Sequence, residues 1–285
     1  MPFDGATPAL VEQLSASVVV RSITLLADKP VAEVLAPCQV LQLSSLRQSE
    51  SLRQLAARSV ADYVMLVTKA TPLQMGLGAL ERMVRVADDS AAAMVYADHY
   101  EHSAQTDGPT KHPAIDYQLG SVRDDFDFGS VLLVRTELFR QWADENAADQ
   151  WLYAGLYDLR LYLSRHGELL HLNELLYTEV ELDNRASGEK QFDYVNPANR
   201  AVQIEMEQVC TRHLKAINAL IDAAALRRVD FDEQPFAVEA SVVIPVYNRA
   251  KTIADAVKSA LEQQTSFDFN VIVVDNHSTR TEEHT

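Results

Sequence analysis

The sequence is poor in cysteine, glycine and tryptophan. Its 285 residues include two cysteines, nine glycines and two tryptophans. Cys38 and Cys210 lie far apart, and neither belongs to a Cys-x-x-Cys pair or to a recognisable Cys/His ligand pattern. We therefore expect neither a zinc site nor a disulfide framework, and a reducing compartment fits this composition best.

Positive charge is also scarce. The chain has 25 Lys and Arg against 41 Asp and Glu, which gives a formal net charge of −16. Nucleic acids and anionic membrane surfaces select proteins with basic faces. We therefore expect no nucleic-acid partner, and the charge indicates little beyond solubility.

Long apolar runs are absent as well. No stretch of about 18 apolar residues occurs, so the sequence predicts no membrane span. The first 17 residues lack the basic start and the apolar core of a signal peptide. We expect a cytoplasmic protein, and a role at a membrane surface would have to come from residues outside this sequence.

The most informative segment is the last 46 residues. An apolar run over residues 241–246 is followed by a stretch with apolar residues at helical spacing, and a second apolar run covers residues 271–274. This order predicts a strand, a helix and a parallel strand. Polar residues follow each predicted strand, at the edge where open α/β sheets bind ligands.

The two motifs that carry this pattern are Ser-Val-Val-Ile-Pro-Val-Tyr-Asn over residues 241–248 and Val-Ile-Val-Val-Asp-Asn-His-Ser-Thr over residues 271–279. Together they resemble the opening of a family 2 glycosyltransferase with a GT-A fold. That resemblance implies a nucleotide-sugar donor whose nucleotide is held by Pro245, Tyr247, Asn248 and Asp275. The alternative is a βαβ unit of unrelated function.

The second motif departs from the family pattern at its end. The family usually continues with Ser-Thr-Asp-Gly-Thr, whereas Ser278 and Thr279 are followed here by Arg280. The glycine turn and its acidic neighbour are missing, which predicts an imperfect half-site.

The rest of the chain alternates predicted strands and helices, which is typical of the α/β class. Its length suggests roughly two domains. The predicted strands cover residues 17–26, 38–43, 62–68, 92–97, 128–134 and 168–177, and the predicted helices cover residues 7–14, 46–60, 72–86, 136–144, 150–165 and 197–228.

This first region resembles the same family more weakly, through residues 61–67, 94–98 and 158–167. The resemblance implies a GT-A-like mixed, mostly parallel sheet flanked by helices. We expect a GT-A-like module with degenerate motifs over residues 1–196 and a helical connector with an acidic linker over 197–239. Residues 240–285 would form the first, truncated βαβ of a family 2 glycosyltransferase domain.

Enzymes of this family usually hold Mg²⁺ or Mn²⁺ with an Asp-x-Asp and activate the acceptor with a carboxylate at a helix start. In this chain the Asp-x-Asp position falls on Thr68, Lys69 and Ala70, and the Glu-Asp pair that supplies the base falls on Gly155 and Leu156. Residues 17–26 also lack the Pro-x-Tyr-Asn element. We therefore expect no metal ligands in this chain, and its catalytic residues stay unknown.

Two polar clusters are candidate acceptor or sugar contacts. Asp98 opens an Asp-His-Tyr-Glu-His run, which is either a metal or sugar site or, as we favour, a solvated loop. Asp124, Asp125 and Asp127 follow Arg123, and they form either sugar contacts or an Arg–carboxylate turn that caps the next strand. We also interpret His213 as part of a solvated helix face, and both tryptophans as core residues.

These observations favour a glycosyltransferase of polysaccharide biosynthesis that transfers a sugar from a nucleotide-sugar to a glycan or lipid-linked acceptor. One alternative is a non-catalytic GT-A-like module that binds glycan or acts as a scaffold for a catalytic domain. In another, residues 240–274 dock on the first module and supply its missing nucleotide half. The donor, the acceptor, the stereochemistry and the oligomeric state stay open.

Overall fold

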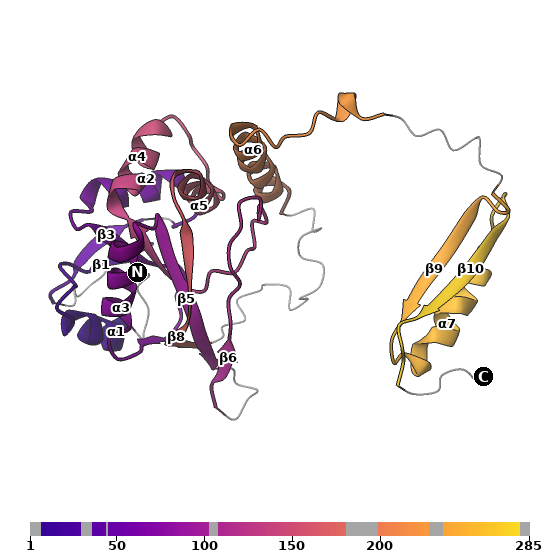
Figure 1. The fold of residues 1–285 in the computed structure, drawn as a ribbon, viewed down its shortest axis with the longest axis horizontal. Helices are drawn as coiled ribbons and strands as arrows, with labels where there is room; N and C mark the ends of the chain where they lie inside the picture. Colours follow the sequence, from indigo (N-terminus) through magenta and orange to yellow (C-terminus); the bar gives the residue numbers. More distant parts are fainter. Residues whose placement is uncertain are drawn as a thin grey trace. The chain divides into compact units, whose positions relative to one another are not determined.

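The chain forms two compact units in a computed structural model (Figure 1). They span Met1–Leu220 and Ile221–Thr285, and each is described by itself. The structure describes residues 7–29, 36–43, 45–102, 108–180, 199–227 and 236–279.

A mixed six-stranded sheet forms the centre of the first unit. Its order is β3-β7-β5-β8-β4, with β6 paired to β5. Within this sheet β5 and β8 are parallel, whereas the other described pairings are antiparallel. The α/β class and the mixed sheet are confirmed, but parallel pairs are fewer than expected because β7 runs back between β3 and β5. The strands are β3 (Tyr63–Val67), β4 (Leu73–Met75), β5 (Met94–His102), β6 (Thr110–His112), β7 (Val131–Arg135) and β8 (Leu169–Val180).

A separate two-stranded parallel sheet contains β1 (Thr24–Ala27) and β2 (Gln39–Gln42). The predicted strand over residues 17–26 is wrong in its first part, since β1 begins at Thr24. Val18 is 93% exposed and Val19 is 40% exposed. The β-branched run therefore has strand propensity but does not pair, because a strand needs a partner as well as propensity.

Helices cover both sides of the central sheet and bury two apolar clusters. The first cluster includes Leu10 of α1 and Met83 of α3, and the second includes Leu52 of α2, Trp142 of α4 and Leu159 of α5. Trp142 is fully buried, as predicted, and Trp151 is half-buried. The helices are α1 (Thr7–Ser15), α2 (Ser49–Arg58), α3 (Ala79–Ser90), α4 (Thr136–Glu145), α5 (Gly155–His166) and α6 (Arg200–Ala216).

The predicted helix over residues 72–86 is wrong in its first turn. Residues 73–75 form β4, and α3 starts only at Ala79. The cause is the backbone between them. The Gly76 N–H donates to the carbonyl of Leu176 on β8, and Gly78 has φ +68, a conformation that glycine adopts readily.

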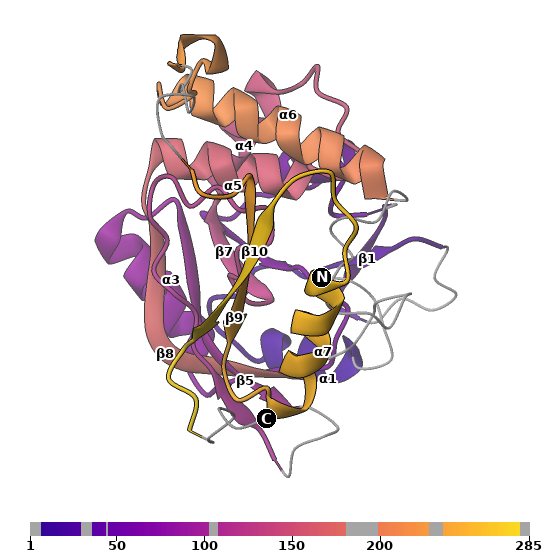
Figure 2. The ribbon, with the colours of Figure 1, turned by 90° about the vertical axis from the view of Figure 1, so that its right-hand side faces the viewer.

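Helix α6 belongs to the first unit. Val209 of α6 packs with Tyr157 and Leu161 of α5, and Figure 2 shows the two helices side by side. The helix is shorter than the predicted 197–228, because it ends at Ala216 just before Asn218 with φ +55. A 3₁₀ turn follows at Ala223–Ala225. The predicted acidic linker at 230–235 lies outside the described residues.

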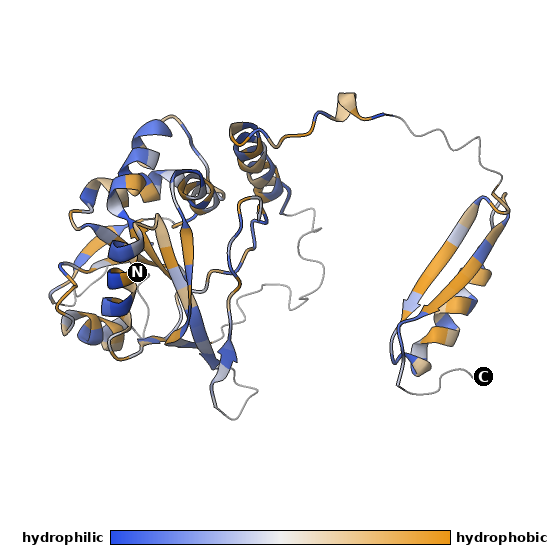
Figure 3. Ribbon diagram, in the orientation of Figure 1, coloured by the Kyte–Doolittle hydropathy of each residue, from blue (hydrophilic) through white to orange (hydrophobic). Residues whose placement is uncertain are grey.

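The second unit has the predicted strand-helix-strand order. It contains β9 (Ala240–Val246), α7 (Ala250–Leu261) and β10 (Phe269–Asp275), with β9 and β10 parallel and Val246 opposite Asp275. Figure 3 shows apolar residues along both strands. Among the described residues of this unit only Val246 is buried, because one helix cannot cover both faces of two strands.

Candidate functional site

The loops after β9 and β10 lie against each other at the carboxyl end of the second unit's sheet. The Asn276 N–H donates to the carbonyl of Val246 over 2.7 Å. Asn248 and His277 both have positive φ, +52 and +61, so each strand ends in a sharp left-handed turn. Asparagine tolerates this conformation better than most residues, which explains why it suits position 248.

Asn248 joins the two loops. Its backbone N–H donates to Ser278 Oγ over 2.9 Å, and its Oδ1 accepts from the N–H of Thr279 over 2.9 Å. Asp275 then fixes Ser278, because Asp275 Oδ1 accepts from Ser278 Oγ over 2.6 Å. The structure therefore places two of the predicted nucleotide residues, Asn248 and Asp275, on one edge.

The other predicted residues flank this edge. Pro245 lies in β9 opposite Val274 of β10, and Tyr247 is 54% exposed. Sequence reasoning missed Ser278 as a member of the site. Its position three residues after Asp275 was a usable signal, because an aspartate side chain often accepts from a backbone N–H a few residues further along its own turn. The exposed Asp275 carboxylate can accept hydrogen bonds from a ligand hydroxyl or N–H.

In the first unit, the position at which the weaker resemblance predicts the catalytic base is sterically closed. Gly155 begins α5, and a Cβ placed there would lie 2.6 Å from the Ser49 nitrogen and 2.7 Å from the Arg47 carbonyl oxygen. The Gly155 N–H also donates to that Arg47 carbonyl over 2.7 Å. Backbone atoms therefore fill the space that a carboxylate side chain would need.

At the position where the weaker resemblance predicts an Asp-x-Asp, the structure has the cation Lys69 between Thr68 and Ala70. Lys69 Nζ lies 2.8 Å from Glu179 Oε1, and the Glu179 side chain is 2% exposed. His99, which is 1% exposed, lies behind it with Nε2 3.7 Å from the same oxygen. No group of three or more potential ligands that could hold a metal occurs in the part of the chain that the structure describes. The family's divalent metal does not fit the residues present.

Asp98 takes part in a histidine–carboxylate cluster. His171 Nε2 lies 2.7 Å from Asp98 Oδ1, and His171 Nδ1 lies 2.8 Å from Asp116 Oδ1. Asp98 Oδ1 also accepts from the N–H of Ala114 over 2.8 Å. These bonds connect the segment after β6 to the central sheet, so Asp98 has internal partners in the structure.

A second cluster surrounds His112 on β6. His112 Nε2 lies 2.8 Å from Asp127 Oδ2, and its Nδ1 lies 3.3 Å from Glu101 Oε2. Its ring stacks on His99 at 4.5 Å between centroids. The favoured interpretation of residues 98–102 as a solvated loop is wrong, because these residues continue β5 and pair with β6 and β8.

Asp125 and Asp124 differ in their surroundings. Asp125 accepts from Arg123 Nε and NH2 over 2.8 and 2.7 Å, and both side chains are exposed. The backbone carbonyl of Arg123 accepts from buried Arg160 NH2 over 2.6 Å. Asp124 is exposed. The geometry has the form of the Arg–carboxylate turn, and contact with a sugar stays a prediction for all four aspartates.

His213 is buried, so its assignment to a solvated helix face is wrong. It is 1% exposed, and its Nδ1 lies 2.9 Å from Arg165 NH1. Burial, reinforced by the Arg165 charge, lowers the pKa of His213 to about 4. The side chain is therefore neutral near pH 7 and accepts from arginine. Its partner on α5 is 48 residues away and could not be read from the helical pattern.

The pairing of His112 predicts a pH-dependent contribution to stability. Burial alone would lower the pKa of His112, but the hydrogen bonds and charges of Asp127 and Glu101 outweigh it, so its pKa is raised above 6.5. A histidine whose pKa is higher in the folded state than in the unfolded state stabilises the fold fully at pH values below its unfolded-state pKa. This stabilisation is lost as the pH rises through the folded-state pKa.

We therefore expect His112→Gln to destabilise the first unit most below about pH 6.5, with the difference from wild type shrinking as the pH rises. Urea unfolding followed by tryptophan fluorescence from pH 5.5 to 8.5 measures this difference. His102→Gln, at an exposed position of β5, is the matched control and should show no such trend. A difference independent of pH would contradict the prediction.

Comparison with known proteins assigns a family to the C-terminal segment. Residues 241–284 match the sequence profile of the family described as "Glycosyl transferase family 2". A search of curated proteins found no match. The match covers the segment that contains β9, α7, β10 and the Asn248–Asp275 edge, and it supports the resemblance on which the nucleotide prediction is based. It does not extend over the first unit.

Proposed function

We propose that this chain is part of a family 2 glycosyltransferase and that residues 240–285 form the first βαβ of its nucleotide-binding domain. The observation that carries the proposal is the edge at which Asn248, Ser278 and Asp275 meet, within the segment that matches the family profile. The reaction would transfer a sugar from a nucleotide-sugar donor to a glycan or lipid-linked acceptor.

In this proposal the chain's own residues bind and orient the nucleotide. Asp275 accepts from a hydroxyl or N–H of the nucleoside, and Tyr247 and Pro245 provide apolar contacts beside it. Asn248 holds the two loops together. The described residues offer no divalent-metal site, so no step that we assign to this chain involves a metal. On composition and resemblance, we also propose a cytoplasmic role in polysaccharide biosynthesis.

We propose a different function for the first unit, namely a non-catalytic GT-A-like module. Two observations favour it: the closed base position at Gly155 and the Lys69–Glu179 ion pair at the metal position. Such a module would bind glycan or support the catalytic domain. The described part of the chain contains no helix that is long and apolar enough to cross a membrane.

Nucleotide titration tests the main proposal. We expect UDP or GDP to bind the chain, and we expect Asp275→Ala to weaken binding roughly tenfold or more, as loss of a hydrogen bond to a charged group does. Isothermal titration calorimetry in the presence of Mn²⁺ measures both. Asp268→Ala, an exposed substitution just before β10, is the matched control and should bind as wild type does. Absence of binding, or equal binding by both variants, would overturn the assignment.

A further inference from the structure

A cavity of about 240 Å³ lies between β1 and β3, and its lining contains none of the predicted site residues. The two strands line it but are not paired with each other. Its wall includes Leu14 and Leu80 of the first apolar cluster and Leu55 and Leu66 of the second. The cavity therefore occupies the gap between the unpaired strands β1 and β3. It borders both apolar clusters of the first unit.

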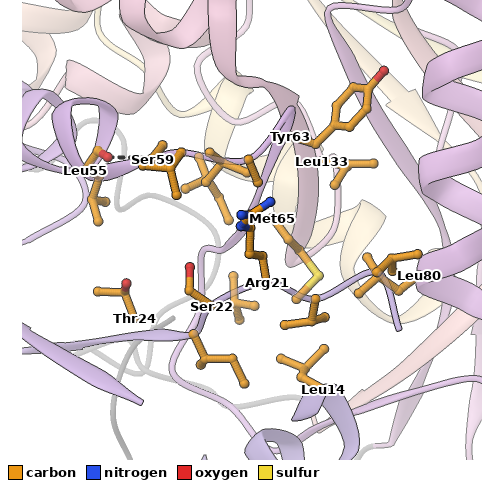
Figure 4. Close-up of a pocket in the computed structure, with 18 of the residues that line it drawn as sticks. Leu14, Arg21, Ser22, Thr24, Leu55, Ser59, Tyr63, Met65, Leu80 and Leu133 are labelled. Atoms are coloured by element: carbon orange, nitrogen blue, oxygen red, sulfur yellow. Dashed lines mark hydrogen bonds between the residues drawn. The ribbon is translucent and has the colours of Figure 1, made fainter. Parts of the chain in front are cut away.

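Two arginines line the same cavity. The exposed Arg21 precedes β1, and Figure 4 shows its side chain reaching between Ser59 and Met65. Arg58 ends α2. Neither guanidinium has an ion pair or a side-chain hydrogen bond in the described part of the chain. The lining contains two arginines and one acidic residue, Asp62, so its net charge is positive, whereas the net charge of the whole chain is −16.

The edge of β3 and the chemistry of the lining suggest different classes of ligand. The outer edge of β3 presents backbone groups of Tyr63 and Met65, because Asp62 and Thr68 bond toward β7 and strand residues alternate. An extended peptide could pair with that edge. A peptide on that edge would use the backbone of β3, whereas the apolar wall and the two arginines match an apolar chain that ends in an anionic group. A small apolar group does fit, since apolar cavities of ~150 Å³ already bind benzene.

We propose that this cavity binds a small amphiphile: a short alkyl chain among the leucines, with an anionic carboxylate or phosphate head on Arg21 and Arg58. The chain end would lie against Leu80 and Val84 of α3. Burial of the alkyl chain supplies affinity. The arginines select an anionic head over an uncharged one. The proposal is independent of nucleotide binding in the second unit.

Calorimetric titration of the full chain with octanoate and octyl phosphate tests the proposal. We expect at least one of them to bind with a stoichiometry of one, and whichever binds identifies the head group. Octanol should bind about fivefold more weakly, the scale of an exposed charge pair, and inorganic phosphate should not bind. Binding of neither amphiphile, or equal binding of octanol, would overturn the proposal.

Two variants locate the ligand. Val84→Phe should fill the cavity and weaken octanoate binding more than tenfold, whereas Arg21→Gln should reduce the preference for octanoate over octanol, with Arg58 retaining part of it. Arg85→Gln, at an exposed α3 position outside the lining, is the matched control. If Val84→Phe does not fold, the exposed Arg21→Gln variant still tests whether Arg21 binds the anionic head. Unchanged selectivity in Arg21→Gln, or binding only of a five-residue valine–serine peptide, would refute the proposal.

Discussion

Gly155→Ala is expected to destabilise the first unit by about 3 kcal/mol or more, a large part of the ~5–15 kcal/mol that typically separates folded from unfolded states. The added methyl carbon would lie 2.6 to 2.9 Å from the backbone of residues 47–49. This backbone cannot yield easily. Ser49 is fully buried, and its N–H donates to the Trp151 carbonyl over 3.0 Å.

Urea unfolding measured by tryptophan fluorescence tests this expectation, because both tryptophans of the chain lie in the first unit. Gly78→Ala is the matched control. Its Cβ would meet nothing within 4 Å, but its φ is +68, so only the conformational cost of about 1–2 kcal/mol applies. Equal losses in the two variants would show that residues 47–49 do not close the position.

The closed position at Gly155 also bears on whether the first unit could catalyse the reaction. A carboxylate at position 155 is what the family's chemistry would need, and Gly155→Asp would place a larger side chain against the same backbone atoms. Restoring the base should therefore unfold this region before it could restore catalysis. Under the proposal of a non-catalytic module, the space that this chemistry would need is occupied by the packing around Gly155.

The second unit could be predicted from the sequence almost residue by residue. Its two apolar runs and one helical period are local signals, and β9, α7 and β10 follow them. Asn248 and Asp275 could be predicted to share an edge because parallel strands end on the same side. The family resemblance supplied their role, which the structure does not test.

Predictions failed where the outcome depended on distant partners. Residues 17–22 have strand propensity, but they pair with no strand in the described part of the chain, and pairing with β2 begins at Ile23, whose carbonyl accepts from the N–H of Gln39. His99 and His213 are polar residues whose burial depends on Glu179 and Arg165, which lie far along the chain. Local periodicity contains no information about such contacts, so a solvated position was the natural expectation.

Asp158→Ala is expected to cost about 2–3 kcal/mol, the scale of leaving a buried donor without its acceptor. Asp158 is 2% exposed, Arg212 NH2 donates to its Oδ1, and Trp142 Nε1 donates to its Oδ2 over 3.0 Å. Alanine leaves the buried indole N–H without its acceptor. Arg212 keeps its ion pair with Asp149 and its contact with the Trp151 ring.

The same change should loosen α6, which Arg212 ties to α5. Hydrogen exchange over residues 200–216 should rise in Asp158→Ala. Asp149→Ala, which removes the more exposed Arg212 contact, should cost no more than about 1 kcal/mol and leave exchange nearly unchanged. If both variants lose stability equally and α6 stays protected, Glu205, which accepts from the N–H groups of Leu152, Tyr153 and Ala154, would be its main anchor. Asp158, a residue of the weaker family resemblance, accepts hydrogen bonds from Arg212 of α6 and Trp142 of α4 and so links both helices to α5.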